Sequence, residues 1–204
     1  MAKTNKNASK INRKTKKVET PITIANYQKL AMRTCLPACE CWAYAHSELI
    51  SEICEFFSKH YGFYAKGVRG DFHLPLGIKN HTKILKEIKK ELGDVAWSLA
   101  LYCKIGGYNF CEELKNAQKT AKKAKTIEEV ANTKLMLYAY VHKTISEVML
   151  NRTGQIITMK GAFRILVAFC RFYNFKVSDV LRDNIRKLAS RQKRGVIMGN
   201  GDNR

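Results

Sequence analysis

Residues 84–107 read ILKEIKKELGDVAWSLALYCKIGG, and this stretch decides the expected fold. Its large apolar side chains recur every three or four positions, which is the spacing of one face of an α-helix. They are Ile84, Ile88, Leu92, Val95, Leu99 and Tyr102. The pattern begins after His81 and Thr82 and stops at Gly106 and Gly107, where glycine favours a helix end. We therefore expect a long amphipathic helix with one face in a core.

The same helical period runs through most of the chain, which has only 3 prolines and 12 glycines. Because strict alternation is rare, we predict an all-α protein, a helical bundle. Further helices are expected at about 24–33, 41–60, 109–125, 126–150, 159–173 and 177–191, with a loop at 62–79. The helix at 41–60 has an apolar stripe and should stop at Gly62. Thr126 and Ser178 are candidate N-caps.

The composition predicts one compact domain with tails, because the chain has 204 residues and 46% of them are hydrophobic. We expect a cytoplasmic protein with no membrane span, since no long apolar run and no secretory signal are evident. Seven cysteines at irregular spacing indicate reduced thiols. Structural zinc at Cys35, Cys39, Cys41 and His46 is a disfavoured alternative, because their spacing matches no usual zinc pattern.

The formal net charge is +20, and much of it lies in residues 1–20. We expect this segment to be a disordered basic tail. Such a tail would give weak, non-specific, salt-dependent contact with nucleic acid. The commoner alternative is a solubilising extension with no partner.

Two pairs of carboxylates are the candidate chemical site. Glu52 pairs with Glu55, and Glu91 pairs with Asp94, each pair three residues apart. Residues at this spacing share a helix face, so two such helices can direct all four acids at one point. Either pair alone is more often a solvated helix face, but both lie beside core positions. Oxygen ligands alone suit a hard cation, so we expect Mg²⁺, with Mn²⁺ as an alternative.

Five segments in order resemble the MazG-like nucleoside triphosphate pyrophosphohydrolases, in particular phage-type members. They are YQKLAMRT at 27–34, SEICE at 51–55, ELGDVAW at 91–97, NIRKL at 184–188 followed by Arg191, and GNGDNR at 199–204. The resemblance implies an all-α bundle that hydrolyses a nucleoside or deoxynucleoside triphosphate to the monophosphate and pyrophosphate with Mg²⁺. It also implies that Glu52, Glu55, Glu91 and Asp94 are the metal ligands, and that the protein works in the host cytoplasm if it is phage-encoded.

The resemblance further assigns substrate contacts to the last helix. Asn184 and Lys187 match the family's Asn and Lys, and Arg191 lies one turn further on, close to the same face. A solvated basic helix end is the alternative. Further candidates for substrate binding are Lys66, Arg69 and Arg204 in loop or tail positions, and Trp97 for stacking on a base. A core role is the commoner one for such a tryptophan.

The resemblance predicts a domain at 21–198 with a helical insertion at about 108–158 that covers the site or mediates assembly, followed by a tail at 199–204. It also implies a homo-oligomer, a dimer or a tetramer. The alternative function is a catalytically degenerate, basic, nucleic-acid-binding helical protein, which the charge of +20 favours.

Overall fold

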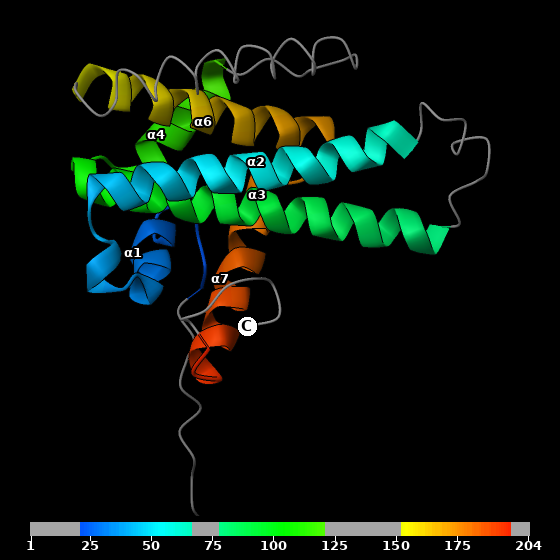
Figure 1. The fold of residues 1–204 in the computed structure, drawn as a ribbon, viewed down its shortest axis with the longest axis horizontal. Coiled ribbons are helices and arrows are strands. Elements are labelled where there is room, and N and C mark those ends of the chain that lie inside the picture. The colour runs from blue at the N-terminus through cyan, green and yellow to red at the C-terminus, as the bar shows by residue number, and fades with distance from the viewer. Residues whose placement is uncertain (1–20, 67–77, 121–151, 197–204) are drawn as a thin grey trace, which may run out of the picture.

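The computed structural model describes residues 21–66, 78–120 and 152–196. Within these ranges the chain forms 6 α-helices and no strand, which confirms the all-α prediction. The long helices α2 (Trp42–Lys66) and α3 (Ile78–Gly106) form an antiparallel pair in the middle of the molecule (Figure 1). No helix in the described part of the chain is long and apolar enough to cross a membrane.

The other helices cover the two sides of this central pair (Figure 1). On one side lie α4 (Phe110–Thr120) and α6 (Arg152–Phe172), and on the other lie α1 (Tyr27–Ala31) and α7 (Val177–Lys193). Two short 3₁₀ helices, η1 (Met32–Thr34) and η2 (Pro37–Cys39), connect α1 to α2. The bundle therefore has three layers, and α3 contacts both outer ones.

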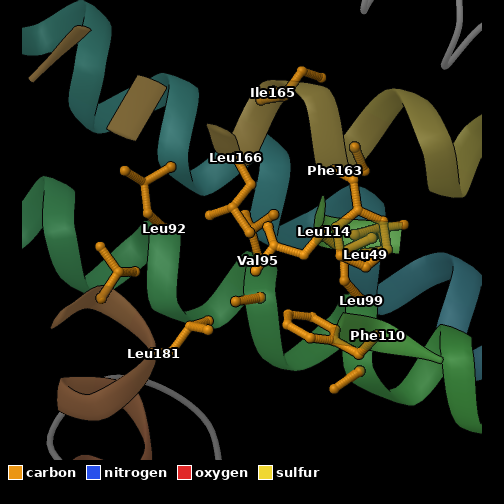
Figure 2. Packing of buried hydrophobic residues seen from close by; sticks show 14 of the residues in the cluster. Leu49, Leu92, Val95, Leu99, Phe110, Leu114, Phe163, Ile165, Leu166 and Leu181 are labelled. Atoms are coloured by element: carbon orange, nitrogen blue, oxygen red, sulfur yellow. The ribbon is translucent and has the colours of Figure 1, made fainter. Parts of the chain in front are cut away.

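The apolar stripes recognised in the sequence form the core of the bundle. On α2, Ala45, Leu49 and Phe56 are buried, and on α3 the stripe from Ile88 to Tyr102 is buried. Figure 2 shows side chains gathered in this core, among them Leu49 of α2, Val95 of α3, Leu114 of α4, Leu166 of α6 and Leu181 of α7. Removal of this apolar surface from water is the main term that stabilises the bundle.

Several helix boundaries differ from the prediction, and most of these differences concern glycine. Helix α2 runs through Gly62 to Lys66, α3 begins at Ile78, and α6 begins at Arg152 and includes Gly154. The predicted loop at 62–79 is therefore wrong at both ends. One glycine costs a helix only about 1 kcal/mol, and a nucleated helix gains a hydrogen bond for each added residue.

The ends of the first and last helices also differ from expectation. Helix α1 is shorter than predicted because it tightens into η1 at Met32. The N-cap of α7 is Lys176, and no side chain caps it, so the assignment of Ser178 as N-cap is wrong. The chain enters α1 through a local turn in which Thr23 N donates to Asn26 Oδ1 at 2.8 Å.

Part of the predicted insertion belongs to the common core. Helix α4 buries Phe110, Leu114 and Ala117. The ring centroid of Phe110 lies 4.9 Å from that of Tyr27 and 5.1 Å from that of Phe163. The predicted helix at 126–150 with its cap Thr126, the tails at 1–20 and 199–204, and the stretch 67–77 lie outside the described residues. Helix α4, a described part of the insertion, therefore packs against both α1 and α6.

Candidate active site

Three acidic side chains from the central helix pair converge at one point. Glu52 of α2 and Glu91 and Asp94 of α3 each offer a carboxylate oxygen, and these oxygens lie within 4.8 Å of one another. Glu91 is only 2% exposed. Burial of a carboxylate is costly unless it is paired or neutralised. Hydrophobic packing therefore does not explain this carboxylate cluster.

The local sequence brings these acids together in a simple way. Glu52 precedes the buried Ile53, and Glu91 precedes the buried Leu92, so both acids lie at the border of a core-facing stripe. Because α2 and α3 run antiparallel and their stripes pack together, the two borders meet. The i, i+3 spacing then adds Asp94 to Glu91 on the same face.

Helix α7 packs against α3 beside these acids, and Gly93 permits its close approach. A Cβ atom at Gly93 would lie 3.0 Å from Cβ and 3.3 Å from Nδ2 of Asn184. These distances are tighter than ordinary van der Waals contacts. Gly93 therefore lets the backbone of α3 approach the side chain of Asn184.

Two residues of α7 contact the carboxylate of Asp94. The ammonium of Lys187 donates to both oxygens, at 2.5 Å for Oδ2, and Asn184 Nδ2 donates to Oδ1 at 3.2 Å. The side chains of Lys187 and Asp94 are 18% and 16% exposed. The structure thus brings Asn184 and Lys187, two of the residues that the sequence analysis placed on the last helix, to Asp94 of α3.

The electrostatics of the carboxylate cluster raise the pKa of Glu52 to about 8. Burial is the largest cause, and the neighbouring carboxylates of Asp94, Glu48 and Glu55 add to it, while Lys187 acts in the opposite direction. The surroundings of Glu52 therefore disfavour its charged form. Three oxygen donors without nitrogen or sulfur fit a hard divalent cation such as Mg²⁺ or Mn²⁺.

The fourth predicted carboxylate, Glu55, lies apart from the other three. It is exposed, and it is not one of the three acids whose oxygens lie within 4.8 Å of one another. It is still close enough to raise the pKa of Glu52. Its role as a ligand stays a prediction.

Two further residues predicted to contact the substrate, Arg191 and Trp97, are at least partly buried. Arg191 is buried, at 8% exposure. The indole Nε1 of Trp97 donates to Ala31 O and to Thr34 Oγ1, both at 3.2 Å, and its ring packs against the core. These contacts support the core role for Trp97, and base stacking stays a prediction.

Three further candidates for substrate binding, Arg69, Arg204 and the side chain of Lys66, lie outside the described residues.

The four residues considered as zinc ligands lie within the described chain. Cys35, Cys39, Cys41 and His46 do not form a group with metal-binding geometry there. His46 Nδ1 instead lies 3.3 Å from the hydroxyl of Tyr102.

Sequence reasoning assigned no role to Tyr27, which the structure connects to the site. Its hydroxyl donates to Asn184 Oδ1 at 2.9 Å, across 157 residues of sequence. The only signal in the sequence is that Tyr27 begins the first segment of the family resemblance. Local periodicity predicts the burial of such a residue but not its distant partner.

A scan against protein-family models and searches of curated proteins and of solved structures gave no match to this chain.

Proposed function

We propose that this chain is a Mg²⁺-dependent nucleotide pyrophosphohydrolase of the MazG-like type. It would convert a nucleoside or deoxynucleoside triphosphate to the monophosphate and pyrophosphate. The observation that carries the proposal is the convergence of Glu52, Glu91 and Asp94 within 4.8 Å, with Lys187 on the same carboxylate. The five ordered segments that resemble this family add support, and so does the all-helical architecture.

The acids of the site would hold the cation, and the cation would bring the triphosphate to them. A divalent cation bound there neutralises charge on the phosphates and lowers the pKa of a bound water. Glu52, Glu91 and Asp94 would be its ligands. Without a cation the same acids would repel a polyphosphate, since like charges in a partly buried site interact strongly.

Lys187 provides a positive group that can serve the substrate. In this structure its ammonium is paired with Asp94. A lysine ammonium on a flexible stem can turn from a carboxylate to a phosphate oxygen, and neutralisation of Asp94 by a cation would favour that turn. Asn184 keeps its bond to Asp94 and so holds that carboxylate in place.

The direct test is to incubate the purified chain with Mg²⁺ and a panel of standard, deoxy, modified and alarmone nucleotides. We expect at least one triphosphate to give the monophosphate and pyrophosphate, separated by chromatography. Orthophosphate as the sole inorganic product, or no hydrolysis of any nucleotide, would contradict the proposal. The mass of the protein under active conditions tests the accompanying proposal of a dimer or a tetramer.

The net charge of +20 favours a second candidate function, a degenerate helical protein that binds nucleic acid. The carboxylate cluster gives this candidate no support, because acids repel a phosphate backbone. Tight, salt-sensitive binding of DNA or RNA without hydrolysis of any triphosphate would establish it. Deletion of residues 1–20, with activity and DNA retention measured separately, tests whether the basic tail instead tethers an active enzyme.

A further inference from the structure

Tyr27 is a fully buried phenol whose polar end points to the carboxylate cluster. It is 0% exposed, its ring packs 4.9 Å from that of Phe110, and its hydroxyl donates to Asn184 Oδ1 at 2.9 Å. Burial and the nearby charge of Asp94 hold the pKa of Tyr27 well above its ordinary value. The phenol therefore keeps its proton and stays a hydrogen-bond donor.

The bond from Tyr27 determines which way the Asn184 amide faces. Because Oδ1 accepts from Tyr27, the amide directs Nδ2 to Asp94 Oδ1 at 3.2 Å. The flipped amide would place its oxygen against the carboxylate, which is repulsive. Asn184 is only 3% exposed, so solvent is poorly placed to replace either bond.

The contact at Gly93 limits the remaining freedom of Asn184. Its Cβ lies where a side chain at position 93 would press on it, so α7 and α3 approach closely at this point. Tyr27 on α1, Asn184 on α7 and Asp94 on α3 form one hydrogen-bonded chain across three helices.

We propose that Tyr27 is a positioning residue for the carboxylate cluster: through Asn184 it fixes the orientation of Asp94 and so sets the affinity of the cluster for a divalent cation. This inference rests on the cation-binding part of the proposed function and adds a residue to it. Groups that orient metal ligands typically change metal affinity by about 10- to 100-fold when they are removed.

The test measures binding of Mn²⁺ to the full chain by electron paramagnetic resonance, without nucleotide. Tyr27→Phe removes only the hydroxyl, and we expect its Mn²⁺ affinity to fall about 10-fold or more. Tyr102→Phe is the matched control, because Tyr102 is also 0% exposed and its hydroxyl contacts His46 instead of Asn184. The affinity of this control should stay within about twofold of the unsubstituted chain, since it loses a buried hydroxyl without disturbing Asp94.

A second variant separates positioning from general loss of packing. Asn184→Leu removes the same link at similar volume, and it should weaken Mn²⁺ binding by a similar factor. In the Asn184→Leu background, Tyr27→Phe should cause no further loss. If Tyr27→Phe does not fold, the single variant Asn184→Leu decides, and unchanged affinity there overturns the inference.

The outcomes for this inference and for the proposed function can be told apart. Equal Mn²⁺ affinity of the unsubstituted chain and Tyr27→Phe overturns the inference, and so do additive losses in the double variant or no Mn²⁺ binding by the unsubstituted chain. If Mn²⁺ binding depends on Tyr27 but no nucleotide yields pyrophosphate, the inference stands and the proposed function fails.

Discussion

Two neighbouring turns of α2 have opposite surroundings. Phe56 packs into an aromatic cluster with α6, where its ring lies 4.7 Å from Phe169 and 5.9 Å from His60. Glu52, one turn earlier, faces Glu91 and Asp94 of α3 and has a pKa raised to about 8. One helix therefore contributes both to an apolar contact and to a cluster of three carboxylates.

The difference shows where stability and chemistry lie in this bundle. In the aromatic cluster the buried histidine is satisfied, because His60 Nδ1 is hydrogen-bonded to the hydroxyl of Tyr173. In the carboxylate cluster, the buried Glu91 and the half-buried Glu52 and Asp94 face one another, an arrangement that costs free energy and that a cation would offset. Substitutions in the two regions should therefore have opposite effects.

The largest effect is expected from Phe169→Ala in the aromatic cluster. Phe169 is 1% exposed, and its truncation leaves a cavity among four rings, so the free energy of unfolding should fall by about 3–5 kcal/mol. Urea unfolding measures this loss. Pyrophosphate release per folded molecule should be unchanged. A loss of activity in the folded variant would contradict the assignment of stability to the aromatic cluster and of chemistry to the carboxylate cluster.

Glu91→Gln should have the reverse outcome. It removes a cation ligand, and we expect pyrophosphate release to fall about 100-fold or more. Its melting temperature should change little, because glutamine has nearly the same size and shape as glutamate and can keep a hydrogen bond at this position. Glu55→Gln, at an exposed carboxylate, is the comparison variant and should lose less activity. Retained activity in Glu91→Gln would contradict the role of the cluster.

The stability of the chain without divalent cation should fall as the pH rises from about 4.5 to about 8. Glu52 has a pKa of about 8 in the folded chain against an ordinary value of 4.5. Between these values the folded chain binds more protons than the unfolded chain, so its stability is greatest below the lower value. We expect a loss on the order of 2 kcal/mol, part of the full shift, because solvent reaches Glu52.

Two controls isolate the contribution of Glu52. Urea unfolding at a series of pH values should show a smaller decline for Glu52→Gln and for the unsubstituted chain in saturating Mg²⁺. An equal decline in all three samples would show that other groups cause it.

The smallest effects are expected from alanine substitutions at two glycines in helix interiors, Gly161 and Gly93. Gly161→Ala adds a methyl group where nothing lies within 4 Å, and it should raise the free energy of unfolding by about 0.5–1 kcal/mol. Gly93→Ala adds the same methyl 3.0 Å from Asn184 Cβ. Gly93→Ala should therefore not raise the free energy of unfolding, and it should weaken Mn²⁺ binding. Thermal unfolding and Mn²⁺ titration of both variants measure this, and identical behaviour would contradict the close contact of α7 with α3.

The buried faces of the long helices could be predicted, and the pairing of distant polar groups could not. The stripe through Leu92 and Val95 follows directly from the helical period. The same rule grouped Glu52 with Glu55, but residues three apart differ by about 60° around a helix. That angle is enough for Glu52 to face the acids of α3 and for Glu55 to be exposed.

The errors at helix ends and the missed residues have physical causes as well. Gly62 does not end α2, because the cost of one glycine is smaller than the gain from a continuing helix. The bond between Tyr27 and Asn184 spans 157 residues, and no local pattern contains it. The role of Gly93 depends on α7, which only the folded chain brings to it.

The most direct measurement is the product balance of a triphosphate incubated with the purified chain, with and without Mg²⁺, and with Asp94→Asn in parallel. We predict monophosphate and pyrophosphate in equal amounts, release that requires Mg²⁺, and loss of release in Asp94→Asn. Release of orthophosphate alone, or pyrophosphate release unaffected by Asp94→Asn, would contradict the account.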